Sequence, residues 1–322
     1  MATVKLNNGT QMPVIGLGTW LSDKGKAGEA VKFALENGYK HIDCAHIYQN
    51  EAEIGEYMSE VWKAGKVKRE DVYIVSKLWS SYQAKEDVVD ACRVTLKNLQ
   101  LEYLDLYLIH VPCQLDKSLG DTVPGADKKG LIGYTAERMR ETWEAMEKLV
   151  EMGLVKSIGV SNFTTKKLKE LMPYVKIKPV CNQVELHPYL PQPKLIDCCK
   201  EYGIVCAAYS PIGAPNRPEF FKENSHPILL EDDVVTSIAE KHKATPAQVA
   251  LAWGIQRGTP VLPKSVTPSR IVENLQAGEL HLDADDMSRI SDVKPRARLV
   301  DQRWGVPMNC TIEDIWDGEY LC

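Results

Sequence analysis

The chain has 322 residues, of which 44% are hydrophobic and 26% are charged, and its formal net charge is −5. This composition is ordinary for a globular protein with a sizeable core, and the acidic balance argues against non-specific binding of nucleic acid. No apolar run is long enough to span a bilayer, and the first residues lack the apolar core of a secretory signal, so we expect no membrane association.

Nine cysteines are scattered along the chain, and none of them forms a Cys-x-x-Cys pair. Several lie inside apolar, strand-like runs. Free or buried thiols of this kind are typical of a reducing compartment. We therefore expect a cytoplasmic protein.

The first predicted element is a β-hairpin, because Asn8-Gly9 separates two short apolar pieces. Residues 14–20 follow as the first core strand. Residues 27–37 then carry apolar side chains at helical spacing, and Gly38 stands where a helix-terminating glycine belongs.

Strand-like runs and helix-patterned segments alternate over the rest of the chain. Further strands are expected at residues 40–42, 72–76, 104–109, 155–160, 180–184, 204–208 and 259–262, and helices at 50–64, 85–99, 135–152, 165–172, 192–201, 231–257 and 268–276. Eight strands, each followed by a helix, predict a single α/β domain over residues 1–322, folded as a (β/α)8 TIM barrel. A doubly wound sheet is the rival, but Leu21 replaces the third glycine of a dinucleotide-binding Gly-x-Gly-x-x-Gly.

Three long segments interrupt the alternation: residues 111–134, residues 212–230 and a tail from about residue 294 to residue 322. Loops at the carboxyl face of a barrel carry its substrate specificity, and we expect all three segments to lie there. Trp304 and Trp316 predict that at least part of the tail docks on the barrel.

Every predicted strand ends on polar or aromatic side chains, and a barrel gathers such ends around one mouth. Asp43, Lys77 and His110, with the nearby Tyr48, form a proton-handling set. A close Lys77 ammonium would lower the tyrosine pKa from its usual value near about 10. Asp43 would hold the lysine, and His110 would orient a carbonyl oxygen. The complete series of strand ends is Thr19, Trp20, Asp43, Lys77, His110, Ser161, Asn162, Gln183, Tyr209, Ser210, Lys264 and Ser265.

Each of these residues also has an ordinary structural role when taken alone, and the joint pattern is what favours a site. A metal site is not expected: His41 and His46 flank Asp43, but they lack helical i, i+4 spacing and there is no His-Glu-x-x-His. A Schiff-base role for Lys77 is the more serious rival. The neighbouring carboxylate argues mildly against it, because it would keep the amine protonated.

A second motif covers residues 263–274. Thr267 is expected to cap a helix with Pro268 in its first turn, so Lys264, Ser265 and Arg270 would converge with the helix start on an anion. An ordinary capped helix with solvated charges would explain Thr267 and Pro268 but not the paired cations. Arg270, Glu273 and Asn274 share one helix face, which suits an adenosine phosphate.

Residues 38–51 resemble the aldo-keto reductase signature, residues 263–274 resemble its NADP-binding signature, and residues 153–163 resemble its middle motif. The resemblance spans essentially the whole chain and is closest to the aldose and aldehyde reductases of animals. It implies a monomeric enzyme that binds NADPH across the carboxyl face of the barrel and passes hydride to an aldehyde or ketone. Tyr48 would be the general acid, assisted by Lys77 and Asp43, and His110 would direct the carbonyl.

The resemblance also implies the binding residues. Ser161, Asn162 and Gln183 would hold the nicotinamide carboxamide, and Tyr209 would stack on its ring. Lys264 and Arg270 would bind the 2′-phosphate, which favours NADPH over NADH. Further cofactor contacts would come from Thr19, Trp20, Asp43, Ser210, Pro211, Ile212, Gly213, Ser265, Val266, Thr267, Glu273 and Asn274, and the substrate pocket from Trp20, Ile47, Tyr48, Trp79, His110 and Val111.

The chain departs from the family pattern in its loops. Leu21 and Asn216 replace a lysine and an aspartate that clasp the cofactor in aldose reductase, so we expect a looser loop and faster cofactor release. Val111 and Glu219 replace pocket aromatics. Two alternatives to a carbonyl reductase stay open: a non-catalytic NADP-binding regulatory subunit on the same barrel, as in potassium-channel β subunits, and a Lys77-dependent aldolase.

Overall fold

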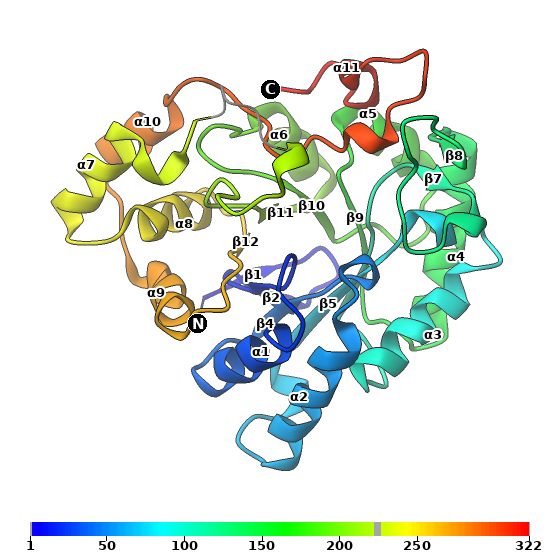
Figure 1. Cartoon of the computed structure of the whole chain (residues 1–322), viewed down its shortest axis with the longest axis horizontal. Helices are drawn as coiled ribbons and strands as arrows, with labels where there is room; N and C mark the ends of the chain where they lie inside the picture. The colour runs from blue at the N-terminus through cyan, green and yellow to red at the C-terminus, as the bar shows by residue number, and fades with distance from the viewer. Residues whose placement is uncertain (1, 222–226, 322) are drawn as a thin grey trace.

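The computed structural model describes residues 2–221 and 227–321 (Figure 1). The chain opens with the predicted β-hairpin of β1 (Thr3–Lys5) and β2 (Gln11–Pro13), in which Val4 pairs with Met12. Its turn contains Gly9 at a φ of +87°, a backbone conformation that glycine adopts without a steric penalty. Leu6 and Met12 pack with side chains from the strands of the barrel, so the hairpin closes one end of it.

Within the described residues, eight parallel strands form one sheet in the order β12-β11-β10-β9-β6-β5-β4-β3. Bridges from Ile15 to Val261 and from Gly18 to Lys264 join the first strand to the last, so the sheet closes into the predicted barrel. The strands are β3 (Leu17–Gly18), β4 (His41–Asp43), β5 (Tyr73–Leu78), β6 (Leu106–Ile109), β9 (Ile158–Ser161), β10 (Cys181–Glu185), β11 (Val205–Tyr209) and β12 (Val261–Leu262).

The helices surround the barrel and bury their apolar faces against it (Figure 1). In α1, the buried residues Ala27, Ala30, Val31 and Ala34 follow the spacing that predicted this helix. The helices are α1 (Ala27–Glu36), α2 (Glu51–Lys63), α3 (Val88–Leu99), α4 (Ala136–Glu151), α5 (Thr165–Leu171), α6 (Pro193–Tyr202), α7 (Asp233–His242), α8 (Pro246–Gln256), α9 (Pro268–Gln276), α10 (Ala284–Ser291) and α11 (Ile312–Ile315).

The single helix predicted over residues 231–257 is wrong: the segment forms two helices, α7 and α8. Lys243 ends α7 at a φ of +53°, outside the helical region. Thr245 then starts α8, because its hydroxyl accepts from the Gln248 N–H and the Gln248 side chain accepts from the Thr245 N–H. With Pro246 in the first turn, this capping box ends one helix and begins another.

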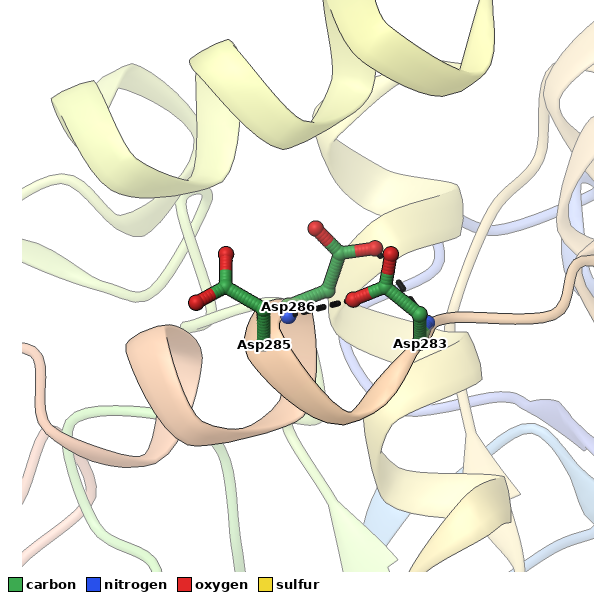
Figure 2. Close-up of side chains that lie close together, drawn as sticks. All are labelled: Asp283, Asp285 and Asp286. Carbon is green, nitrogen blue, oxygen red and sulfur yellow. Dashed lines mark hydrogen bonds between the residues drawn. The ribbon is translucent and has the colours of Figure 1, made fainter.

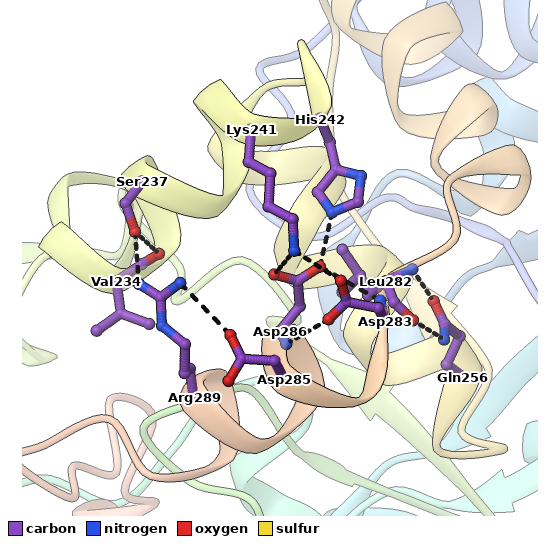
Figure 3. Close-up of polar contacts among 10 residues, drawn as sticks. All are labelled: Val234, Ser237, Lys241, His242, Gln256, Leu282, Asp283, Asp285, Asp286 and Arg289. Atoms are coloured by element: carbon purple, nitrogen blue, oxygen red, sulfur yellow. Dashed lines mark hydrogen bonds and ion pairs between the residues drawn. The ribbon is translucent and has the colours of Figure 1, made fainter.

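Helix α10 was missed by the sequence prediction, and acidic side chains attach it to α7. Asp283 accepts from the Asp286 N–H at 2.9 Å, and Asp286 accepts in return from the Asp283 N–H at 3.2 Å (Figure 2). The buried Asp286 carboxylate also pairs with Lys241 at 2.8 Å and His242 at 2.6 Å (Figure 3). Asp285 lies beside them, 4.0 Å from Arg289. The carboxylates of this cluster therefore serve as a helix cap and as anchors between two helices.

The predicted long segments are partly ordered into short elements. Residues 111–134 contain β7 (Gln114–Leu115), β8 (Leu131–Gly133) and the 3-10 helix η4 (Lys117–Leu119). Residues 222–226 of the second segment lie outside the described residues. The tail contains the 3-10 helix η9 (Arg303–Gly305) and α11, which lies near α5 in Figure 1.

The tail docks on the barrel as predicted. Trp316 is buried, and its indole N–H donates to the Asp301 carbonyl at 2.9 Å. The Arg298 guanidinium lies 3.7 Å from the centre of the Trp316 ring. At the end of β10, the Glu185 carboxylate accepts from the Leu299 N–H at 2.6 Å. These contacts fix the start of the tail above the carboxyl ends of the strands.

Candidate active site

A cavity of about 1360 Å³ opens at the carboxyl ends of the barrel strands. Two of the predicted site residues do not line it. Lys77 is fully buried within the floor of the cavity and does not reach its surface, and Gly213 turns the loop after β11 at a φ of +79°. The predicted residues that line the cavity are Thr19, Trp20, Asp43, Ile47, Tyr48, Trp79, His110, Val111, Ser161, Asn162, Gln183, Tyr209, Ser210, Pro211, Ile212, Lys264, Ser265, Val266, Thr267, Arg270, Glu273 and Asn274.

The structure brings the predicted proton-handling set together. Lys77 lies on β5, beside β4, and its Nζ donates to Asp43 Oδ2 at 2.7 Å, to the Cys44 carbonyl at 2.8 Å and to the Tyr48 hydroxyl at 3.3 Å. Tyr48 ends the 3-10 helix η1 (His46–Tyr48). The Tyr48 and His110 rings meet edge to face, with their centres 5.7 Å apart. A phenol, an ammonium, a carboxylate and an imidazole therefore share one floor.

Burial sets the protonation of this group. Burial lowers the pKa of Lys77, but Asp43 and Tyr48 together outweigh burial and the net pKa is raised, so the amine stays charged. Burial lowers the pKa of His110 well below its usual value, and the Lys77 ammonium lowers it further, so this imidazole is neutral.

The pKa of Tyr48 is set by two opposing influences, of which the predicted one from Lys77 is the smaller. Lys77 does lower the pKa of Tyr48, but burial of the phenol is the larger influence, and the pKa rises to about 12. The hydroxyl therefore holds its proton at neutral pH. This state suits a proton donor.

Side-chain amides fix the neighbouring strand ends. Gln183 donates to the second carboxylate oxygen of Asp43 at 2.7 Å. Asn162 adopts a φ of +62°, which turns its amide so that Nδ2 donates to the His110 carbonyl at 2.9 Å while Oδ1 accepts from the Tyr209 hydroxyl at 2.8 Å. The Ser161 hydroxyl donates to the Gln183 carbonyl at 2.7 Å. The ends of five strands, β4, β6, β9, β10 and β11, are thus joined by one polar network at the floor of the cavity.

The far end of the cavity carries the second motif. Lys264 donates to the Leu21 carbonyl at 2.8 Å, and Arg270 is exposed on the first turns of α9. Thr267 is the N-cap residue of α9 and Pro268 lies in the first turn, as predicted. The Thr267 side chain makes no capping hydrogen bond, and the Thr267 N–H donates to Ser265 Oγ at 3.1 Å. Both cations nevertheless face the same cavity.

Sequence reasoning missed the lining residues that the loops supply. Trp304 packs on Trp79 with ring centres 5.6 Å apart. Phe221 meets Trp20 edge to face at 6.2 Å. Their aromatic character was the only signal in the sequence, because loops lack the periodicity that assigns side chains to a face. Further lining residues outside the prediction include Val123, Pro124, Lys128, Arg217, Val300, Gln302 and Arg303.

Comparison with known proteins agrees with this fold. The model of the Aldo/keto reductase family matches residues 14–295. Aldo-keto reductase family 1 member A1 of Gallus gallus is 45% identical over 298 residues, which cover 92% of this chain and 90% of that one. Prostaglandin F synthase 1 of Bos taurus is 45% identical over 308 residues, which cover 94% of each chain.

Among solved structures, the aldose reductase from Schistosoma japonicum superposes with a TM-score of 0.86 at 41% identity, covering 94% of this chain and 96% of that one. The fold and the comparisons define an NADP-dependent oxidoreductase built on a (β/α)8 barrel. The chain belongs to the aldo/keto reductase family. In the part of the chain that the structure describes, no helix is long and apolar enough to cross a membrane.

Family membership implies a nicotinamide cofactor, and the donors along the cavity fit one. The cavity runs from the Tyr48 hydroxyl to Lys264 and Arg270, so it spans from a proton donor to a pair of cations. Cations beside a helix start bind phosphate well, and the polar side chains between the two ends offer hydrogen-bond partners. This donor set matches a long, anionic ligand.

Proposed function

We propose that the protein reduces aldehydes or ketones to alcohols with NADPH, with Tyr48 as the general acid. The observation that carries the proposal is the hydrogen-bonded series from Asp43 through Lys77 to the Tyr48 hydroxyl, which faces the cavity. A bound NADPH would supply the hydride that the carbonyl carbon accepts. All other steps fall to side chains of the chain itself.

Tyr48 would donate its proton to the carbonyl oxygen of the substrate. The raised pKa of Tyr48 keeps this proton available, and the Lys77 ammonium stabilises the phenolate that forms. Asp43 holds Lys77 in its charged form. The neutral His110 ring, whose edge meets Tyr48 at the cavity floor, would hold the carbonyl oxygen by a hydrogen bond.

Binding of the cofactor would use both ends of the cavity. Ser161, Asn162 and Gln183 would hold the nicotinamide carboxamide, and Tyr209 would stack on the ring. Lys264 and Arg270 would take the 2′-phosphate. The loop of Ser210–Gly213 would follow the pyrophosphate, and Glu273 and Asn274 would contact the adenine; all except Gly213 line the cavity.

The loop over the cofactor would be held without an ionic clasp. Leu21 and Asn216 both line the cavity, at the positions where aldose reductase has a lysine and an aspartate. A leucine and a neutral amide cannot attract each other across the cleft as opposite charges do. We therefore expect the cofactor to leave faster than it does with the charged pair.

The test is oxidation of NADPH by the purified chain in the presence of an aromatic aldehyde, followed by nicotinamide absorbance. Steady turnover supports a reductase, and NADPH binding without turnover of any aldehyde or ketone would instead support a regulatory subunit. An aldolase would need a free Lys77 amine, whereas this amine is buried, charged and bonded to three partners. Borohydride should therefore trap no carbonyl compound on Lys77. In keeping with the family, we propose a cytoplasmic monomer.

A further inference from the structure

One wall of the cavity is a small apolar core that lies outside the barrel. It consists of the buried residues Trp79, Val111, Cys113 and Leu115, packed with Ile47, Tyr82, Leu119, Leu131 and Trp304. Trp79 stands between His110 and the tail: its ring centre is 5.5 Å from that of His110 and 5.6 Å from that of Trp304. Trp304 is therefore one ring away from the residue that would hold the carbonyl.

The segment that carries Trp304 is hydrogen-bonded both locally and by a residue of a different loop. Its own segment, η9, supplies a local bond, from the Trp304 indole N–H to Gln302 Oε1 at 2.9 Å. Lys128, in the segment between β7 and β8, donates from Nζ to the Trp304 carbonyl at 3.1 Å and to the Arg303 carbonyl at 3.2 Å. One ammonium thus joins this loop to two successive carbonyls of η9.

The backbone of the loop around Lys128 is held in a closed turn that directs the ammonium toward η9. Lys128 adopts a φ of +54°, which is uncommon for a residue other than glycine. Its N–H donates to the Gly125 carbonyl at 3.1 Å, and its carbonyl accepts from the Leu131 N–H at 3.1 Å, so the turn is closed on both sides. Asp121 anchors the same loop by accepting from the Tyr82 hydroxyl at 3.2 Å and by pairing with His46 at 2.7 Å.

We propose that Lys128 is a positioning residue that sets the substrate preference of the enzyme. By holding η9, its ammonium keeps the Trp304 ring against Trp79 and so defines the apolar wall beside His110. Carbonyl compounds with an aromatic or long apolar body reach the Trp304 end of this wall, whereas short aldehydes reach only Trp79 beside His110. The inference rests on the proposed reductase function and names the substrate class that the wall selects.

The test compares two substrates, propanal and a biphenyl aldehyde, in the variant Lys128→Met. Methionine keeps the length and apolar stem of the side chain but loses the ammonium. The two lost hydrogen bonds are charge-assisted but partly exposed, so we expect a moderate effect. The ratio of the KM for the biphenyl aldehyde to the KM for propanal should rise about fivefold, and the ratio of the two kcat values should stay unchanged. Lys129→Met is the matched control, since Lys129 is an exposed lysine next in sequence and should leave both ratios unchanged.

Rescue separates positioning from general damage to the loop. Lys128→Arg restores a cationic donor and should return the KM ratio to within about twofold of the wild type. An unchanged KM ratio in Lys128→Met would overturn the proposal. An equal loss of kcat/KM for both substrates would also overturn it, because the loop would then affect the whole site and not the apolar wall alone.

A second measurement does not require activity. The chain has 7 tryptophans, so the acrylamide quenching that belongs to Trp304 is obtained by subtracting a Trp304→Phe background. Lys128→Met should make Trp304 more accessible to acrylamide, and Lys129→Met should not. Unchanged quenching in Lys128→Met would overturn the positioning role. Failure of the wild type to turn over either aldehyde would instead defeat the proposed reductase function, and quenching would still decide the role of Lys128.

Discussion

The floor of the cavity is made by strand ends, whereas its apolar wall is made by segments outside the barrel. On the floor, Asp43, Lys77 and Gln183 are buried and bonded to one another across three strands. On the wall, Trp304 comes from the tail, and its carbonyl accepts from Lys128 of another loop. A mutation on the floor should therefore change catalysis or cofactor binding, and a mutation on the wall should change which substrates bind.

Lys77→Met should have the largest effect among the following changes. It removes the ammonium that, in the proposed mechanism, would stabilise the Tyr48 phenolate, and we expect kcat to fall about a thousandfold, within the range of general acid catalysis. The NADPH affinity should change little, because Lys77 lies beneath the cavity and does not line it. Steady-state kinetics and cofactor titration measure the two quantities, with circular dichroism as the folding control. A Lys77→Met variant that keeps most of the wild-type kcat would show that catalysis does not require the Lys77 ammonium.

Lys264→Ala combined with Arg270→Ala tests the far end of the cavity. Two lost charge-assisted contacts should weaken NADPH binding about a hundredfold. NADH lacks the 2′-phosphate and should bind as it does to the wild type. Fluorescence titration with both cofactors gives the comparison. Equal weakening for NADPH and NADH would mean that these cations do not recognise the extra phosphate.

The double variant Leu21→Lys/Asn216→Asp tests how a loop holds the cofactor. A new ion pair at the surface is worth less than about 1 kcal/mol, so we expect NADP+ release to slow only about threefold. Stopped-flow measurement of cofactor release gives the rate, and each single variant serves as a control. No change in the double variant would show that an ionic clasp at these positions has no influence on release.

The smallest effect concerns stability and pH at the base of β4. Burial lowers the pKa of His41 below 6.5, so the unfolded chain binds a proton near that pH and the folded chain does not. The free energy of unfolding should therefore fall as the pH drops below 6.5, by at most about 1 kcal/mol from this residue over the first pH unit. Urea unfolding of wild type and His41→Gln checks it. Identical pH dependence in the two proteins would assign the fall to other groups.

The floor was predictable from the sequence because a barrel rule fixes where strand ends lie. Asp43, Lys77 and His110 follow short apolar runs, and parallel strands carry their ends to one mouth. Lys77 lowers the pKa of Tyr48 as predicted, but the larger, opposite influence of burial was not predicted, because burial depends on packing that one sequence does not display. The wall was not predictable, since nothing in the spacing of Lys128 and Trp304 shows that they meet.

The division between α7 and α8 is a different kind of error. The signal was present in the sequence, because Thr245, Pro246 and Gln248 form a recognisable capping pattern. The apolar periodicity of the segment continues across this capping pattern, and the prediction gave the periodicity more weight than the cap. In contrast, the limits of α9 agree with the prediction because Pro268 marks its first turn.

Tyr48→Phe gives the most direct test of the central claim. The claim is that the Tyr48 phenol donates the proton, while other residues bind the cofactor. Tyr107→Phe is the matched control, since it removes a tyrosine hydroxyl from a buried position on β6 that does not line the cavity. In single-turnover reduction of an aromatic aldehyde, Tyr48→Phe should lose at least about a thousandfold in rate while its NADPH affinity and folding stay as in the wild type. A Tyr48→Phe variant that keeps most of the wild-type rate would contradict the account.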